Sequence, residues 1–159
     1  MPNLSPEDTR RHERIIEAVK HHTQQNIVPK LKPLLVVLYG STAKGEYTPA
    51  SDIDLLIVAD NLPKNYWDRW SLAYSLVENR PLDPHIYTPQ EFKEMIKQGR
   101  MTALDALTEG ITLHADPKYQ QEIIKLLKQT LKKRVKIKNM WIPKEILPKL
   151  QQHKPRRPY

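Results

Sequence analysis

The stretch that decides the fold is Gly40-Ser41-Thr42-Ala43-Lys44-Gly45, followed after a short spacer by Ser51-Asp52-Ile53-Asp54. An apolar run at 34–39 precedes it, and the run at 55–59 continues from it. Two nearly continuous apolar runs separated by small and polar residues predict two buried strands joined by a turn and a short helix or loop. The chemistry-bearing side chains of this stretch therefore lie at the ends of core strands.

The two aspartates of this stretch predict a metal site. Alternate side chains of a strand share a face, so Asp52 and Asp54 point the same way while Ile53 points to the other side. Carboxylates held so close repel each other unless a cation lies between them. A solvated strand face is the simpler alternative, but it fits poorly with a strand that is apolar on both sides. We therefore predict a hard-metal site that faces a phosphate-binding turn.

The turn at Gly40 and Ser41 is suited to phosphate. Backbone N–H groups and the Ser41 hydroxyl can hold phosphate oxygens, and the missing side chain of Gly40 permits their close approach. An ordinary turn is the alternative for these two residues taken alone. Their order and spacing relative to the aspartates favour phosphoryl chemistry.

Asp83 is the candidate for a third carboxylate, because it lies in the next predicted strand, 82–87, which can pair beside the second strand. Pro84 follows it directly, and proline cannot donate to a strand ladder. Either Asp83 is displaced or the strand begins there. His85 can share the face of Asp83, although a surface histidine is the simpler interpretation.

The remaining pattern alternates helices with short strands, which is typical of an α/β or α+β domain. Ser5 and Pro6 predict a helix that runs to about His22 or beyond, and proline residues 29 and 33 predict a break before the first strand. A capping box at 88–91 predicts a helix that ends near Gly99. The other predicted elements are helices over 64–78, 103–107 and 119–131 and a strand over 111–114. In the first of these helices the spacing of Trp67, Trp70, Tyr74 and Val77 predicts a core stripe.

The 159 residues suffice for one domain with a core of its own. The absence of cysteine excludes disulfides, thiolate zinc sites and cysteine nucleophiles. No apolar run is long enough for a bilayer, and the N-terminus lacks the pattern of a signal peptide, so we expect a cytoplasmic protein with no membrane partner.

The net charge of +8 is concentrated at the C-terminus, where residues 128–159 contain eleven Lys and Arg and one Glu. We therefore predict a domain over 1–131 and a basic, proline-containing tail over 132–159 that is extended and weakly ordered. Its mixture of cations with Trp141, and with Arg156 and Arg157 near its end, suits nucleic acid. A solvated tail has a similar composition and is the simpler interpretation, and a dock for a partner protein is another alternative.

These residues carry a family resemblance. The Gly40-Ser41 pair, the second glycine at Gly45 and the segment 51–55 closely resemble the minimal nucleotidyltransferase family of the DNA polymerase β superfamily. The resemblance covers about residues 34–114 and includes Asp83 and the segment 109–111.

The resemblance implies a nucleotidyltransferase fold, in which helices flank a small mixed sheet. It implies Mg²⁺ held by Asp52, Asp54 and Asp83, which are also the implied catalytic residues. The residues that it assigns to an NTP, with ATP as the expected substrate, are Gly40, Ser41, Lys44 and Ser51. For Lys44, a role in offsetting triphosphate charge and an exposed loop position both stay open.

The implied reaction is attack by an acceptor hydroxyl on the α-phosphorus, with release of pyrophosphate and with Asp83 helping to deprotonate the acceptor. Minimal members of this family commonly act as antitoxins of small helical HEPN ribonuclease toxins, so such a toxin is an expected partner. A small-molecule or RNA acceptor, an antitoxin or adaptor that works by contact alone, and nucleic-acid binding through the tail are the alternatives.

Overall fold

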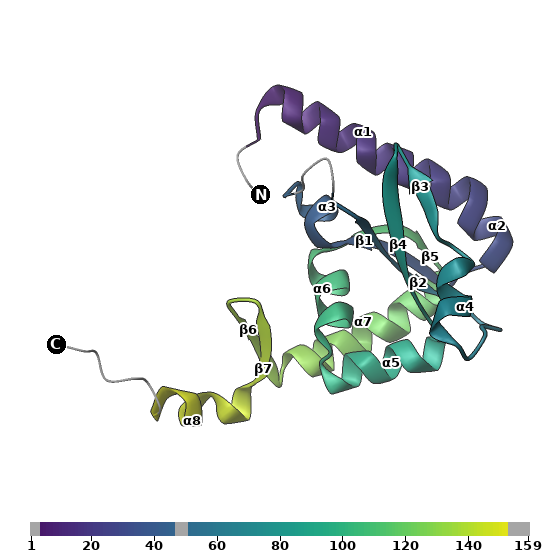
Figure 1. The fold of residues 1–159 in the computed structure, drawn as a ribbon. Coiled ribbons are helices and arrows are strands. Elements are labelled where there is room, and N and C mark those ends of the chain that lie inside the picture. Colours follow the sequence, from purple (N-terminus) through teal and green to yellow (C-terminus); the bar gives the residue numbers. More distant parts are fainter. Residues whose placement is uncertain (1–3, 47–50, 153–159) are drawn as a thin grey trace.

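The computed structural model describes residues 4–46 and 51–152, in which a five-stranded mixed sheet lies between two layers of helices (Figure 1). The strand order is β3-β4-β2-β1-β5, and β2 and β4 are parallel while the other neighbours are antiparallel. The strands are β1 (Leu35–Tyr39), β2 (Ile53–Val58), β3 (Ser75–Val77), β4 (Arg80–Tyr87) and β5 (Ile111–Ala115). The predicted fold class, a small mixed sheet flanked by helices, is confirmed.

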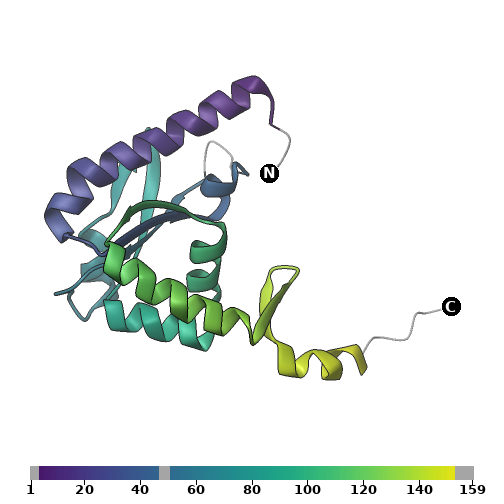
Figure 2. The same cartoon turned by 180° about the vertical axis from the view of Figure 1, so that it is seen from behind.

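Helices cover both faces of the sheet. On one face lie α1 (Pro6–His22), the π-helical turn η1 (Thr23–Ile27) and α2 (Val28–Leu31). On the other lie α5 (Pro89–Gln98), α6 (Met101–Glu109) and α7 (Pro117–Leu131), as the reverse view shows (Figure 2). Two short helices, α3 (Gly40–Lys44) and α4 (Tyr66–Ser71), follow β1 and precede β3.

The alternation of β2 divides the core between these two layers. Ile53, Leu55 and Ile57 pack toward α1, whereas Leu56 and Val58 pack toward α5, α6 and α7. All five side chains are fully buried, and burial of each contributes about 1.5–3 kcal/mol. Since side chains alternate, Asp54 takes the same face as Leu56 and Val58, at the beginning of the strand.

The predicted helix ends are confirmed where local signals set them. The Ser5 side chain accepts the backbone N–H of Asp8 at the start of α1, and Thr88 with Glu91 forms the capping box of α5. The expected break between Pro29 and Pro33 is confirmed, because the chain turns at Lys32, whose φ is 46°. Pro29 itself lies at the start of α2, where a missing N–H is tolerated.

The prediction of a helix from 64 to about Glu78 is wrong for the second half of that range. The α4 helix ends at Ser71, and residues 75–77 form β3. Glu78 and Asn79 both have positive φ, as a two-residue hairpin turn between β3 and β4 requires. The predicted core stripe is thereby divided: Val77 is buried in the strand, but Trp67 is 68% exposed.

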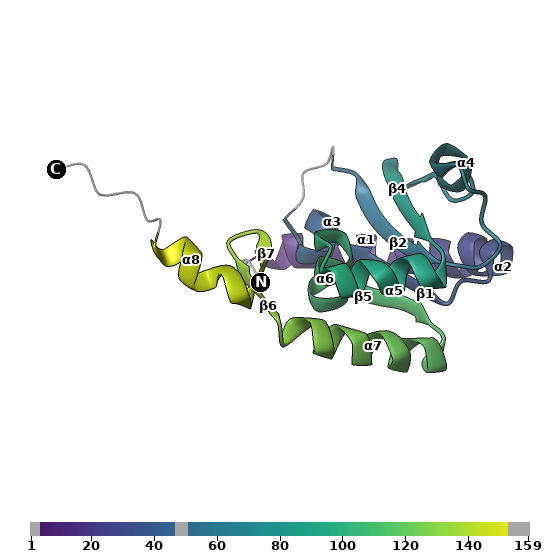
Figure 3. The same ribbon diagram turned by 90° about the horizontal axis from the view of Figure 1, so that it is seen from below.

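The tail is not simply extended. A hairpin of β6 (Arg134–Ile137) and β7 (Met140–Pro143) follows α7, and then come a 3₁₀ turn (Lys144–Ile146) and α8 (Leu147–Gln152), which projects from the body (Figure 3). Residues 153–159, with Arg156 and Arg157, lie outside the described residues. The boundary between a domain at 1–131 and a tail at 132–159 stays a prediction.

Tertiary contacts with α6 hold the hairpin. Lys136 Nζ lies 2.9 Å from Asp105 Oδ1 and 2.7 Å from Glu109 Oε1. Trp141 Nε1 donates to the same Asp105 oxygen at 2.9 Å. We call this group, together with Lys44, which also contacts Glu109, the hairpin anchor. The acidic partners of the hairpin come from α6, which is distant in the sequence. No local sequence pattern therefore predicts that this segment is ordered.

Within residues 4–46 and 51–152, none of the helices has the length and apolar character needed to cross a bilayer.

Candidate active site

The parallel pairing of β2 and β4 places Asp54 and Asp83 side by side. They are register partners, in line with the prediction that the strand of Asp83 pairs beside the strand of Asp54. The buried positions of β4 alternate, so Asp83, His85 and Tyr87 share the half-buried face. Two carboxylates and an imidazole thus meet at one end of the sheet.

His85 lies between the two carboxylates. Its Nε2 atom is 3.7 Å from Asp54 Oδ1 and 3.3 Å from Asp83 Oδ2. The neighbouring carboxylates, Asp54 first and then Asp83, raise the pKa of His85 above its usual 6.5, although burial acts in the opposite direction. The interpretation of His85 as a surface histidine is therefore wrong. We call Asp54, Asp83 and His85 the acidic centre.

Pro84 does not displace Asp83. Strand β4 begins at Arg80, and Pro84 keeps its register with Leu55 of β2. The Tyr87 carbonyl accepts a hydrogen bond from Ala59 at the end of β2, so the odd-numbered residues of β4 direct their backbone groups toward β2 and Pro84 directs its own away. On that side β3 pairs only as far as Leu82. Pro84 therefore lies where β4 has no partner strand on that side, so its missing N–H breaks no ladder bond.

Gly40 brings the turn after β1 against the acidic centre. Its φ of +74° is a conformation that L side chains rarely adopt, and a Cβ at this position would lie 2.5 Å from Asp54 Oδ2. Only glycine permits both this backbone and this close approach. The sequence analysis expected position 40 to lack a side chain so that a phosphate could approach. In the structure the group that lies close to Gly40 is the Asp54 carboxylate.

The other predicted residues lie around this contact. Asp52 is exposed just before β2, and its carbonyl accepts a hydrogen bond from Thr42 Oγ1 at 3.3 Å. Within the described ranges, the one group of three or more metal-ligating side chains whose donor atoms lie within 4.8 Å of one another is the acidic centre, without Asp52. Ser41 and Ser51 are half-buried on either side of the spacer.

Lys44 lies in α3 and is half-buried, and its side chain forms an ion pair. Its Nζ lies 2.8 Å from Glu109 Oε2, and about two fifths of its side chain is exposed. Glu109 is shared with Lys136, and these two lysines lower the pKa of its carboxyl below the usual value. Lys44 therefore links the turn after β1 to the hairpin anchor.

Two aromatic residues of the site were missed by the sequence analysis. Trp70 Nε1 donates to Asp83 Oδ1 at 3.0 Å, and the rings of Tyr39 and His85 pack in a T-shaped arrangement with centroids 5.7 Å apart. Burial and the nearby charge of Asp54 raise the pKa of Tyr39. The alternation of Asp83, His85 and Tyr87 along the predicted strand could have indicated that these residues share one face of the sheet. No local sequence pattern indicates the hydrogen bond from Trp70 to Asp83.

The donor set of the acidic centre suits a divalent cation. Two carboxylate oxygens and one imidazole nitrogen are ordinary metal ligands, and Trp70 supplies the kind of outer hydrogen bond that orients a ligating carboxylate. Asp54 Oδ1 faces His85 while its Oδ2 faces Gly40. An ion held here would thus lie beside the turn predicted to receive phosphate.

Comparison with known proteins gives a family match and several partial similarities. The family described as "Nucleotidyltransferase domain" matches residues 12–109, which is more than half of the chain and includes the acidic centre. The "Putative protein adenylyltransferase" of Methanocaldococcus jannaschii is 43% identical over 42 residues, which cover 26% of this chain and 29% of that protein. The chain thus matches less than a third of that relative.

Two solved structures are similar in part. A putative nucleotidyltransferase from Sulfolobus solfataricus is 19% identical, with a TM-score of 0.46 over 70% of this chain and 90% of the other. A toxin–antitoxin complex with AMP-PNP is 20% identical, with a TM-score of 0.43 over 73% and 83% of the two chains.

Proposed function

The chain belongs to the nucleotidyltransferase domain family, and from this premise we propose that it transfers AMP from ATP to a hydroxyl group of a protein. The observation that carries the proposal is the contact of Gly40 with Asp54, because it sets a phosphate-binding turn directly beside paired carboxylates. The name of the Methanocaldococcus relative supports a protein as acceptor.

In the proposed reaction, the acceptor oxygen bonds to the α-phosphorus, the bond from that phosphorus to the bridging oxygen breaks, and pyrophosphate leaves. The acceptor proton passes to the Asp83 carboxylate. Backbone N–H groups at Gly40 and the Ser41 hydroxyl hold the triphosphate, with Ser51 and Lys44 beside it. Asp54 and Asp83, with Asp52 nearby, would hold a divalent ion, which would supply positive charge to offset the negative charge that develops on the phosphate oxygens. Mg²⁺ is the ion that the motif resemblance implies.

The protein acceptor that we propose is a HEPN-type toxin, which the chain neutralises as an antitoxin. This step is taken from the motif resemblance at Gly40-Ser41 and 51–55. The non-catalytic alternative, neutralisation by contact alone, keeps the same partner but needs neither carboxylate.

The test is incubation of the purified chain with Mg²⁺ or Mn²⁺, α-³²P-ATP, and either cell-lysate protein or total RNA. Its variant is Asp52→Asn with Asp54→Asn, and its matched control is the exposed Asp60→Asn. We expect a labelled protein band that the double variant loses and the control retains. Labelled RNA would move the acceptor class to nucleic acid. A double variant that still neutralises a toxin, without label in the wild type, would support contact alone.

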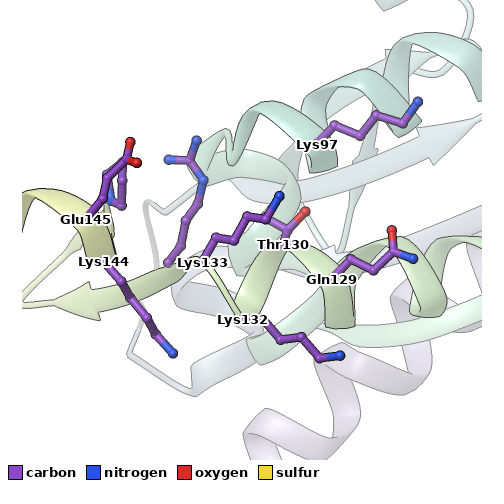
Figure 4. A pocket seen from close by; sticks show the side chains of 9 residues that line it. Lys97, Gln129, Thr130, Lys132, Lys133, Lys144 and Glu145 are labelled. Carbon is purple, nitrogen blue, oxygen red and sulfur yellow. The ribbon is translucent and has the colours of Figure 1, made fainter.

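A second candidate function is binding of nucleic acid, and a pocket near the end of α7 favours it. The pocket has a volume of about 650 Å³ and lies between α5, α7 and the hairpin (Figure 4). Its charged lining consists of Lys97, Lys132, Lys133, Arg134, Lys144 and one acid, Glu145. In the part of the chain that the structure describes, only Lys97 among these cations has an ion-pair partner, Glu94. Such a concave cationic surface suits a phosphodiester backbone.

Charge neutralisation tests this candidate better than truncation, because the hairpin packs on α6 and its removal would disturb the body. We expect Lys132→Gln, Lys133→Gln and Lys144→Gln together to weaken binding of a fluorescent single-stranded RNA and to flatten its salt dependence by about two to three units of log–log slope. The control neutralises three exposed lysines elsewhere, Lys20, Lys64 and Lys125. Equal losses in both triple variants would refute a defined site.

A further inference from the structure

His85 introduces a nitrogen donor into the acidic centre. Its Nε2 atom lies 3.3 Å from one Asp83 oxygen and 3.7 Å from one Asp54 oxygen, and the three donors are within 4.8 Å of one another. For an ion about 2.1 Å from each donor, neighbouring donors are about 3.0 Å apart in octahedral and about 3.4 Å apart in tetrahedral geometry. The two distances from His85 Nε2 are therefore close to the spacing that an ion would impose, and the two carboxylate oxygens lie within 4.8 Å of each other.

Each donor is oriented by a separate neighbour. Trp70 engages Oδ1 of Asp83 and leaves Oδ2 toward His85. The turn at Gly40 lies against Oδ2 of Asp54 and leaves Oδ1 toward His85. The Tyr39 ring packs against the imidazole. The groups that converge on this point come from β1, α3, β2, α4 and β4, so the convergence is a property of the fold rather than of one flexible side chain.

The chemistry of this donor set differs from that of an all-oxygen site. Mg²⁺ prefers oxygen ligands in near-ideal octahedral geometry, whereas imidazole suits first-row transition metals. Affinity of a mixed nitrogen and oxygen site rises from Mn²⁺ to Co²⁺ along the series. A histidine at this position thus favours transition-metal ions over Mg²⁺.

We propose that His85 is a direct metal ligand, and that the centre formed by Asp54, Asp83 and His85 selects a divalent first-row transition-metal ion in preference to Mg²⁺. The inference rests on the proposed function, since it concerns the ion of the same site. The competing account is that His85 merely pairs with the two carboxylates, so that any cation has to displace it. The two accounts predict opposite effects of removing the imidazole.

The experiment titrates the full chain, freed of metal, with Co²⁺ followed by optical absorption and with Mn²⁺ followed by electron paramagnetic resonance. Mg²⁺ is measured by competition with Mn²⁺. Each titration is run alone and with a non-hydrolysable ATP analogue. The variants are His85→Ala and His85→Gln, with exposed His21→Ala as the matched control. Circular dichroism melting verifies the fold of each variant.

We expect the wild type and His21→Ala to bind Co²⁺ more tightly than Mn²⁺, and both more tightly than Mg²⁺. His85→Ala should weaken Co²⁺ binding by about tenfold or more and leave Mg²⁺ within about threefold. Pulsed resonance of bound Mn²⁺ should show ¹⁴N coupling in the wild type and the control but not in His85→Ala.

Absence of ¹⁴N coupling in the wild type, tighter binding of every cation by His85→Ala, or failure of Co²⁺ and Mn²⁺ to bind would each overturn the inference. The wild-type coupling decides the matter even if both variants misfold. Nitrogen coupling without any AMP transfer would refute the proposed function and leave this inference standing. AMP transfer without nitrogen coupling would refute this inference and leave the proposed function standing.

Discussion

The acidic centre and the hairpin anchor each contain two carboxylates, but they balance that charge differently. In the hairpin anchor, Asp105 and Glu109 face the ammonium groups of Lys44 and Lys136 at 2.7–2.9 Å. In the acidic centre, the one ion-pairing partner of Asp54 and Asp83 among the described residues is His85, which they share. Matched charges of this kind hold a structure together, whereas a carboxylate pair without a matching lysine or arginine is set up to receive a cation. We therefore infer that the first cluster is structural, and we propose the second as the functional one.

The largest expected effect comes from removing a charge of the acidic centre. Asp83→Asn should lower AMP transfer by about a hundredfold or more, because it removes both a metal ligand and the proposed proton acceptor. The melting temperature should stay unchanged or rise, since a like-charge repulsion is relieved. Transfer assays and calorimetry measure the two quantities. If Asp83→Asn lowered the melting temperature strongly and retained AMP transfer, Asp83 would be a structural residue and not a catalytic one.

The next effect tests the contact between the turn and Asp54. Gly40→Ala adds a Cβ 2.5 Å from Asp54 Oδ2, so we expect at least about a tenfold loss of transfer, as for other small misplacements in active sites. Gly45→Ala is the matched control. Its φ of +73° imposes the same backbone strain of about 1–2 kcal/mol, but its Cβ would meet Leu4 instead. Urea unfolding should show similar losses for both variants, and only Gly40→Ala should lose transfer. Equal transfer in the two would refute the importance of this contact.

A smaller and opposite pattern is expected at the hairpin anchor. Asp105→Ala removes the acceptor of Trp141 and one of the two acceptors of Lys136, and it should reduce the free energy of unfolding by about 1–2 kcal/mol. Transfer and Co²⁺ binding should stay within about twofold of the wild type. Chemical denaturation gives the first value and the assays above give the others. Lost metal binding in a stable Asp105→Ala protein would erase the distinction between the two clusters.

The smallest effects are pH dependences of opposite sign. The lowered pKa of Glu109 means that its contribution to stability is present above about pH 4.5 and is lost as the pH falls through the folded-state pKa. The raised pKa of His85 means that its contribution, in metal-free protein, is present below pH 6.5 and is lost as the pH rises through the folded-state pKa. We would measure the free energy of unfolding of Glu109→Gln, His85→Gln and the wild type across pH 3–9. The value for Glu109→Gln should approach the wild-type value at the low-pH end, and the value for His85→Gln should approach it at the high-pH end. Convergence at the same end would contradict these assignments.

The sequence predicted the acidic centre better than the hairpin anchor, for a physical reason. Asp54 and Asp83 owe their juxtaposition to two apolar strands, whose pattern is local and periodic. The pairing of Lys136 with Asp105 and Glu109 depends on residues about 30 positions apart, which no local pattern reports. The same holds for the bond from Trp70 to Asp83. The helical spacing of Trp67, Trp70 and Tyr74 was misleading, because the hairpin turn at Glu78 and Asn79 diverts the chain into a strand that pairs with β4.

Pro84 has a consequence for the hydrogen-bond balance of the sheet. Beyond Leu82, β4 has no partner strand on the side of β3 within the described residues, yet Pro84 is buried. A buried backbone N–H without a partner would cost about 1–3 kcal/mol, and proline has no N–H to leave unpaired. The proline that made the third aspartate look doubtful in the sequence is thus the residue type that suits a buried position next to Asp83 where the ladder has ended.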